Sequence, residues 1–503
     1  MRISKADETR PVLVGVGQWL SREDDLAVAA DPLEAIEAAL RRACEDAELR
    51  FADLAGFDTV ALVDPIGWRA ENACGLLAEH LGAHGARRVQ TALGGEMGCR
   101  LLNEVAGAIV EGRSRRACVA GVNLLRTALR AKAMGVKLDW PSGGSGTVER
   151  VGRVKPGVSD LEMAYGLGVP VTVYPMFENV LRAKRGRSIA EHADALGRLM
   201  TRFTKVAAEN PHAWFPRERS AHELVTVSET NRMIAFPYPK YLNAVIATDQ
   251  AVAILVLSAA EARRLGIPEA RWVDWRGGAG NIEAIWNPVE RPELTRSEAL
   301  ARTGQAALAA AGIELDAIDA FDLYSCFPVA VEVACEMLGL DEDDPRGFTV
   351  TGGLPYAGGP GNAYTLHALA AMVEKLRENG AASGLVTGNG WYLTKHSASV
   401  LARGPGATPA LPAIHADAPE AKGRLKVVVE ANGSARIDGY TVVYGRGGGP
   451  ERGMIVGRLE SGERFLAQLS AEPGALLAFA EEEGVGRTGR VAFRDGMNLF
   501  TPA

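Results

Sequence analysis

Cysteine is scarce in this sequence: only six occur among 503 residues, and no two form a Cys-x-x-Cys pair. Free thiols are therefore expected, rather than a disulfide framework or a zinc ribbon. The sequence has no uninterrupted apolar run of the roughly 18 residues that a membrane span needs. It also lacks the His-Glu-x-x-His and Gly-x-Ser-x-Gly motifs, which argues against metalloproteases and α/β-hydrolases.

An excess of positive charge is also missing, because 55 basic residues stand against 62 acidic ones and the net charge is −7. This balance gives no general attraction to nucleic acid or anionic lipid, and any phosphate contact must be local. The first ten residues are polar and charged, so we expect a cytoplasmic protein. The length of 503 residues predicts two to four compact units, and the 47% of hydrophobic residues is typical of an ordinary soluble globular protein.

The sequence contains a weak internal duplication. Phe57-Asp58 recurs as Phe321-Asp322, and Gly94-Gly95 recurs as Gly358-Gly359 at the same offset. Around these pairs the two halves show the same order of apolar strands and alanine-rich helices. The matched segments are 11–16, 32–47, 96–109 and 117–121 in the first half, and 271–275, 296–311, 362–376 and 384–388 in the second. We predict an α/β fold built from two similar halves around a pseudo-twofold axis.

The remaining segments complete the predicted domain organisation. Residues 126–232 form an insertion with a helix from Ser188 to Asn210, and residues 424–503 contain five short strands with glycine-rich turns, typical of an OB-like β-barrel. The predicted domains are 1–125 with 233–270 (first half), 126–232 (insertion), 271–404 (second half), 405–423 (linker) and 424–503 (barrel).

Five short segments carry a resemblance to a known family. They are Val12 to Gln18, Lys205 to Pro211, Ala247 to Ala253, Tyr324-Ser325-Cys326-Phe327 and Gly358-Gly359-Pro360. In this order and spacing they resemble the thiolase superfamily over about Pro11 to Gly404, and more narrowly the type 1 thiolase-like proteins with an additional C-terminal domain. The resemblance implies a duplicated, layered α/β/α/β/α fold and places the chain among acetyl-CoA acetyltransferase-like proteins of lipid metabolism.

Thiolases take up an acyl group on a cysteine at the start of a buried helix, where the helix N-terminus lowers the thiol pKa. The matching position here is Gly95, so the nucleophile is expected to be lost. Cys99 lies one turn further along and is either a displaced nucleophile or a small buried side chain. The family histidine of a Gly-His-Pro motif is likewise replaced, by Gly359, and His367 is interpreted as structural.

Two further family motifs survive in altered form. Where sterol-carrier-type thiolases have His-Asp-Cys-Phe, this sequence has Tyr324-Ser325-Cys326-Phe327. Cys326 is therefore either an acid/base group or packing, and Tyr324 can donate its hydroxyl to a substrate oxygen. In the last family loop, Gly388 and Gly390 flank Asn389, and their N–H groups can form an oxyanion pocket. Tyr392 and His396 are additional candidates that alternatively are ordinary loop residues.

The family's insertion covers coenzyme A, and a basic cluster precedes the main helix of the insertion here. Arg182, Lys184, Arg185 and Arg187 are expected either to pair with CoA phosphates or to form a solvated charged face. The resemblance implies acyl-CoA as substrate or ligand, no tightly bound cofactor and no metal.

Three functional hypotheses follow. The first is an acyl-CoA-binding protein with impaired thiolysis, because Gly95 and Gly359 replace the catalytic pair. The second is an aldolase or retro-aldolase, a carbon–carbon lyase, that uses Tyr324 and Tyr392, with the barrel as an in-chain partner. The third is a lipid-CoA binder or scaffold whose barrel recruits another protein. Single-stranded nucleic acid is discounted because the barrel has few aromatics, and a monomer or a homodimer is expected.

Overall fold

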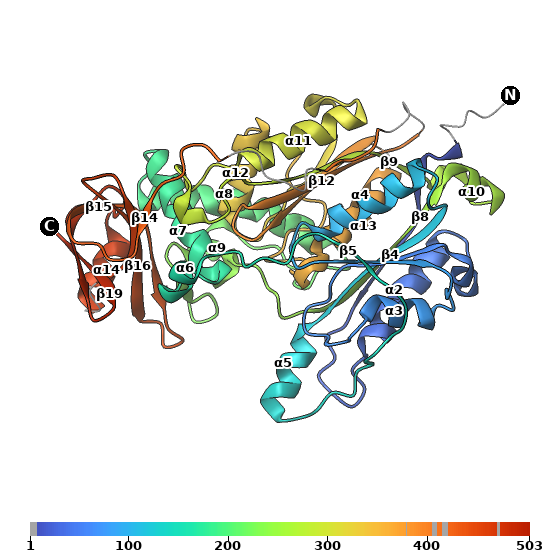
Figure 1. Ribbon diagram of the computed structural model, residues 1–503, viewed down its shortest axis with the longest axis horizontal. Helices are drawn as coiled ribbons and strands as arrows, with labels where there is room; N and C mark the ends of the chain where they lie inside the picture. The colour runs from blue at the N-terminus through green and yellow to red at the C-terminus, as the bar shows by residue number, and fades with distance from the viewer. Residues whose placement is uncertain (1–7, 379, 405–409, 415–420, 470–472) are drawn as a thin grey trace.

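The structure is a computed structural model, and it describes residues 8–378, 380–404, 410–414, 421–469 and 473–503. A large α/β body occupies one end of the molecule and a small β-barrel the other (Figure 1). Much of the predicted linker, residues 405–409 and 415–420, lies outside the described residues. None of the described helices has the length and apolar character that crossing a bilayer requires.

The body contains one long, bent sheet in the order β10-β11-β12-β9-β1-β8-β4-β2-β3-β5. β1 and β9 pair over only two residues each, Val12 and Leu13 with Asp274 and Val273, so the sheet bends there. The strands are β1 (Pro11–Leu20), β2 (Thr59–Leu62), β3 (Arg87–Thr91), β4 (Arg116–Leu124), β5 (Glu149–Val151), β8 (Asp249–Ser258), β9 (Val273–Ile282), β10 (Ala320–Asp322), β11 (Ser383–Gly390) and β12 (Lys395–Ala402), and the short β13 (Ala413–Ile414) pairs with β9.

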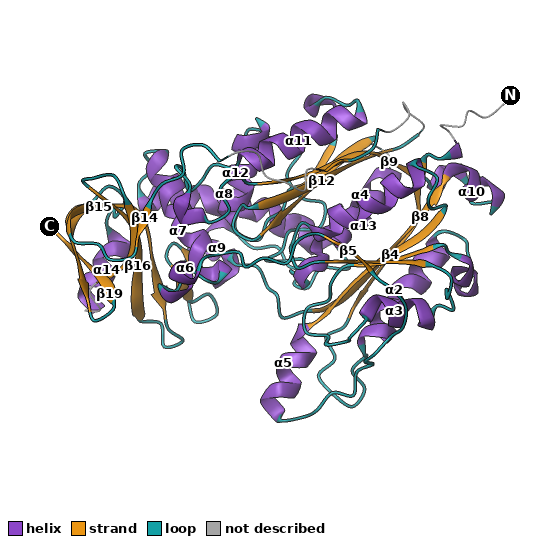
Figure 2. Ribbon diagram, in the orientation of Figure 1, coloured by secondary structure: helices purple, strands orange, loops and turns teal. Residues whose placement is uncertain are grey.

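Two buried helices, α4 (Met97–Val110) and α13 (Tyr364–Arg377), lie between the two parts of this sheet and contact both (Figure 2). The outer faces are covered in the first half by α2 (Pro32–Asp46), α3 (Ala73–His80) and α10 (Ala259–Arg264), and in the second by α11 (Glu298–Ala311) and α12 (Pro328–Leu338). This arrangement confirms the predicted duplicated α/β/α/β/α fold.

The predicted insertion supplies α5 (Leu125–Met134), α6 (Asp160–Ala164), α7 (Pro170–Lys184), α8 (Ile189–Glu209) and α9 (Ala221–Val225), and the short strands β6 (Met233–Ala235) and β7 (Tyr238–Pro239) follow it. The predicted long helix is α8, and it begins where Ser188 and Glu191 form a reciprocal capping box. Ala235 of β6 pairs with Val443 of the C-terminal sheet, although residues 233–239 belong to the predicted first half. The domain bounds themselves stay a prediction.

The C-terminal region forms a closed barrel, as predicted. Its five strands are β15 (Gly433–Tyr444), β16 (Pro450–Leu459), β17 (Arg464–Leu469), β19 (Met497–Pro502) and β18 (Thr488–Arg494), in that order around the barrel, and β18 closes on β15. The sequence pattern predicts the five strands at 425–430, 437–444, 454–459, 464–468 and 490–493, and the first of these is wrong. Residues 425–430 supply only β14 (Val427–Val428), which pairs with β17 outside the ring, and β19 and the helix α14 (Pro473–Glu481) were not predicted.

The outer face of β16 and β17 packs against the body. Met454, Val456 and Leu466 belong to the main core, whereas the alternate residues Ile455 and Phe465 fill the barrel interior. In an OB barrel, the second and third strands of the barrel usually form the ligand-binding face. Here the second and third strands of the barrel are β16 and β17. The body of the same chain covers this face.

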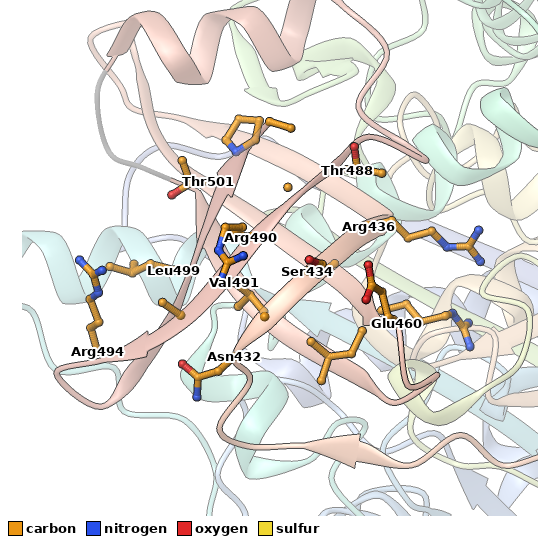
Figure 3. A pocket seen from close by; sticks show the side chains of 18 of the residues that line it. Asn432, Ser434, Arg436, Glu460, Thr488, Arg490, Val491, Arg494, Leu499 and Thr501 are labelled. Carbon is orange, nitrogen blue, oxygen red and sulfur yellow. The ribbon is translucent and has the colours of Figure 1, made fainter.

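A hollow of about 1090 Å³ lies on the outer surface of the barrel, over β15, β16, β18 and β19. Figure 3 shows Arg436, Arg490 and Arg494 spread along this surface, with Glu460 beside Arg436. Because these arginines do not converge on one point in the view, the hollow resembles an open charged face more than a small-molecule pocket.

Candidate functional site

The N-terminal ends of α4 and α13 meet at the centre of the body. The Cys99 N–H donates to the Thr365 hydroxyl at 3.2 Å, and that hydroxyl donates to the Gly95 carbonyl at 3.3 Å. The Gly94 N–H donates to the Asn362 side chain at 3.0 Å. The N-terminal ends of the two central helices therefore face one another.

Gly95 lies directly against Tyr324. A Cβ atom added to residue 95 would overlap the Tyr324 hydroxyl and come within 2.5 Å of the Asn389 carbonyl oxygen. The phenol therefore fills the space in which a cysteine side chain at this position would begin. Both Gly95 and Tyr324 remain partly exposed, so this point is not sealed from solvent.

The position of Tyr324 is fixed on two sides. Its backbone N–H donates to the Thr387 hydroxyl at 3.1 Å, and its ring packs edge-on against Tyr364 at 5.6 Å between centroids. Burial raises the pKa of Tyr324 well above 10, and the nearby Cys326 and Glu96 raise it further. The hydroxyl is therefore a neutral proton donor at physiological pH.

Cys326 lies in an aromatic pocket beside this centre. Tyr174 stacks on Phe327 at 4.7 Å, donates its hydroxyl to the Trp391 carbonyl at 2.7 Å and accepts from the Asn389 amide at 2.8 Å. Burial raises the pKa of the Cys326 thiol to about 12. The structure thus brings Tyr324, Cys326 and Asn389 into one region, with Cys326 as a neutral thiol.

The two glycines around Asn389 make room for a side chain from the opposite half. A Cβ atom at Gly388 would lie 2.7 Å from the Glu96 Cα, and one at Gly390 would overlap the Glu96 carboxylate. The predicted oxyanion pocket stays a prediction. In the structure, the absence of a side chain at Gly388 and Gly390 allows Glu96 to approach their backbone closely.

An ion pair that the sequence analysis missed lies here. Lys395 Nζ is 2.8 Å from Glu96 Oε1 and donates to the Leu93 carbonyl at 2.8 Å, and both charged side chains are almost fully buried. Among the described atoms, Glu96 Oε2 has no hydrogen-bond partner. The pair joins residues far apart in the chain, so no local motif reveals it.

The other residues that were predicted for the site are buried and make hydrogen bonds within the protein. The Cys99 thiol is fully buried and donates to the Val386 carbonyl at 3.7 Å, as expected of a small packed side chain. The Tyr392 hydroxyl donates to the Gly168 carbonyl at 2.9 Å, and His396 is 3.0 Å from the Ser297 hydroxyl. The Gly359 N–H donates to the Val245 carbonyl at 2.8 Å.

The basic cluster is paired internally, which argues against its predicted role with CoA phosphates. Arg182 is buried and makes a bidentate pair with Glu483 of the barrel, at 2.7 and 2.9 Å. Lys184 lies 2.8 Å from Glu336, and the Arg185 guanidinium contacts two further glutamates, Glu332 and Glu342. These carboxylates already neutralise the charges that a phosphate would need.

Comparisons with known proteins agree with this architecture. Residues 419–496 match the family described as the thiolase-like protein type 1 additional C-terminal domain. A monomeric SCP2-thiolase-like protein type 1 from Mycobacterium smegmatis is 32% identical, with 99% of this chain and 100% of that chain covered and a TM-score of 0.82. A search of curated proteins finds no match.

More distant solved structures share the fold of the body. The Ltp2–ChsH2(DUF35) aldolase is 19% identical over 79% of this chain and 99% of that chain, with a TM-score of 0.60. The acetyl-CoA acetyltransferase from Syntrophomonas wolfei is 17% identical over 78% of this chain and 99% of that chain, with a TM-score of 0.55.

Proposed function

The chain belongs to the type 1 SCP2-thiolase-like proteins, and we propose that it cleaves a carbon–carbon bond in a β-hydroxyacyl thioester without forming a covalent acyl-enzyme. The overlap between the Tyr324 hydroxyl and the side-chain position of Gly95 carries this proposal. A nucleophile is missing from the place where thiolases need one, and a proton donor occupies that place.

A retro-aldol step suits a neutral phenol. As the Cα–Cβ bond breaks, its electron pair moves to Cα, the β-hydroxyl becomes a carbonyl, and the thioester enolate takes a proton at Cα. Tyr324 gives that proton and regains one from the β-hydroxyl, so the enzyme ends unchanged. The high pKa of Tyr324 keeps the phenol protonated and supports this relay.

Acyl-CoA is the proposed substrate class. Support comes from the thiolase architecture and from the fold that this chain shares with an acetyl-CoA acetyltransferase and an aldolase. The name of the aldolase pairs Ltp2 with ChsH2(DUF35). In this chain the barrel is covalently attached and buries its β16–β17 face on the body, which supports a role as an in-chain partner.

A monomer is the proposed state, as in the M. smegmatis relative. The three-residue strand β5 pairs with β3 and ends this side of the sheet. It carries the exposed charged residues Glu149 and Arg150. Short, charged edge strands disfavour pairing with a second sheet.

The test is to incubate the full chain with a panel of β-hydroxyacyl-CoA esters and to measure the released aldehyde or ketone together with the shortened acyl-CoA. Tyr324→Phe should lower kcat by about 10²-fold or more and leave KM nearly unchanged. Tyr444→Phe, a half-buried barrel tyrosine, is the matched control. Rapid thiolysis of acetoacetyl-CoA by CoA, or full activity in Tyr324→Phe, would contradict the proposal.

A further inference from the structure

One arginine of the barrel reaches into the body. Arg464 of β17 is almost fully buried, and its guanidinium donates to the carbonyls of Val289 and Arg291 at 3.0 and 2.6 Å. On the barrel side, the same guanidinium lies 3.0 Å from the carboxylate of Asp438 on β15. Arg464 therefore joins the barrel directly to the segment of the body that contains Arg291.

The side chain of Arg291 continues from this segment to the turn between β11 and β12. Arg291 is buried, and its guanidinium makes five hydrogen bonds, which matches its five N–H donors. Two of them go to carbonyls of its own segment. The other three go to the turn, namely to the carbonyls of Tyr392 and Leu393 at 2.8 and 3.2 Å and to the hydroxyl of Thr394 at 2.7 Å. All five acceptors are neutral, so Arg291 acts here as a rigid fork of hydrogen-bond donors.

The backbone of this turn, residues 391–394, adopts a conformation that needs support. Trp391 and Leu393 have φ angles of 56° and 53°, in the left-handed region that residues with side chains disfavour. Such a conformation persists where the surrounding structure holds it. Arg291 binds the turn from one side, and Tyr174 donates its hydroxyl to the Trp391 carbonyl at 2.7 Å.

The 391–394 turn also borders the centre that contains Tyr324. Asn389 directly precedes the turn and donates its amide to the Tyr174 hydroxyl at 2.8 Å. The Asn389 carbonyl oxygen lies 2.5 Å from the place of a Cβ atom on Gly95, which is the place that the Tyr324 hydroxyl fills. A shift of the turn would therefore move one wall of the space beside Tyr324.

We propose that Arg464 and Arg291 are positioning residues, through which the barrel holds the 391–394 turn, and with it Asn389, in the geometry that the reaction needs. The positioning role rests on the proposed carbon–carbon cleavage. The hydrogen-bonded link from the barrel to the turn does not depend on that reaction. Through this link, the barrel acts on the catalytic centre by way of the backbone of the body.

Hydrogen–deuterium exchange of the full chain tests the link without a substrate. Arg464→Met removes the hydrogen bonds to the body but leaves Asp438 paired with Arg458 at 2.7 Å. Amide exchange across residues 389–395 should become about tenfold faster, whereas exchange in α4 and α13 should stay unchanged. Arg458→Met is the matched control, because Arg458 binds the same Asp438 and the Gly462 carbonyl, both within the barrel. This control should leave exchange across residues 389–395 unchanged.

Steady-state kinetics with β-hydroxyacyl-CoA esters tests the positioning role. Arg464→Met should lower kcat by about tenfold or more and change KM little, because a displaced wall misaligns a substrate that still binds. Arg464→Lys keeps a positively charged donor for the carbonyls, so it should recover part of the lost kcat and part of the lost protection from exchange.

Three results would overturn the proposal. They are unchanged exchange across residues 389–395 in Arg464→Met, equal acceleration of exchange throughout the body, and faster exchange across these residues with an unchanged kcat. If the wild type cleaves none of the esters, the proposed function fails, whereas the exchange experiment still decides the link. If neither Arg464 variant folds, exchange of the wild type in sub-denaturing urea replaces them. Residues 464–469 and 389–395 should then lose protection together, and independent loss would overturn the link.

Discussion

The hydroxyl of Tyr324 occupies the position at which a side chain on Gly95 would begin. The two residues exclude each other sterically, so a side chain at position 95 and the phenol in its present place cannot both be accommodated. A cysteine introduced at position 95 therefore needs a second change, at position 324, to make room for its side chain.

The first prediction concerns this exclusion. Gly95→Cys should lower the free energy of unfolding by about 1–3 kcal/mol, because the new Cβ meets a packed phenol. Urea unfolding measures the loss in the free energy of unfolding for each variant. The loss in the double variant Gly95→Cys with Tyr324→Ala should be about 1 kcal/mol smaller than the sum of the losses in the two single variants. Gly85→Cys is the control, since a Cβ there meets nothing within 4 Å. If the two losses in the free energy of unfolding are strictly additive, the side chains at positions 95 and 324 do not compete for the same space.

The second prediction concerns the thiols. All six cysteines are buried, and burial raises the pKa of Cys99 and of Cys326 to about 12. The native protein at pH 8 should therefore react very slowly with a disulfide reagent such as DTNB, whereas the protein in guanidinium should titrate six thiols. Fast modification of the native protein that disappears in Cys326→Ser would instead identify an activated cysteine.

The duplicated glycine pairs allowed the fold to be predicted, because a glycine pair precedes a buried central helix in both halves, α4 after Gly95 and α13 after Gly359. Tyr324 and Cys326 were predictable from one motif. Lys395 was not, because its partner Glu96 comes from the other half and neither residue carries a local signal. The ion pair between Arg182 and Glu483 was not predicted for the same reason, since Glu483 belongs to the barrel.

The third prediction is a pH dependence of stability. Glu332 is fully buried, and burial beside Glu178 raises its pKa to about 8, whereas an ordinary glutamate has 4.5. The folded chain therefore binds more protons than the unfolded chain between these values, and the free energy of unfolding should fall as the pH rises toward 8. Glu332→Gln keeps an acceptor for Arg185 without a titrating group, so its stability should fall less steeply.

Urea midpoints between about pH 6.5 and 8 measure this slope. His192 lies in the same cluster, and burial lowers its pKa to about 4, so its contribution changes below this window. Glu336→Gln, an exposed position on the same helix α12, is the control and should follow the wild type. Parallel curves for Glu332→Gln and the wild type would show that Glu332 does not titrate in this range.

The fourth prediction concerns the docked barrel. Val456 belongs to the core that β16 and β17 share with the body, so Val456→Asp should destabilise the protein by about 3–5 kcal/mol, because it buries an unpaired charge at a packed position. Ser434→Asp, on the exposed face of the same barrel, should change stability by less than about 0.5 kcal/mol. If Val456→Asp and Ser434→Asp lower the free energy of unfolding equally, the stability of the protein does not depend on the contact between the barrel and the body.

The same contact predicts how the barrel treats nucleic acid. With its β16–β17 face covered, the barrel should give no anisotropy change with a labelled single-stranded oligonucleotide, even at low salt, where phosphate contacts are strongest. Arg490 and Arg494 on the open outer face are the groups that could contradict this expectation. If the oligonucleotide binds in a salt-dependent way and Arg490→Glu abolishes this binding, the expectation is wrong. The outer face of the barrel would then be its binding surface, and a polyanion would be its ligand.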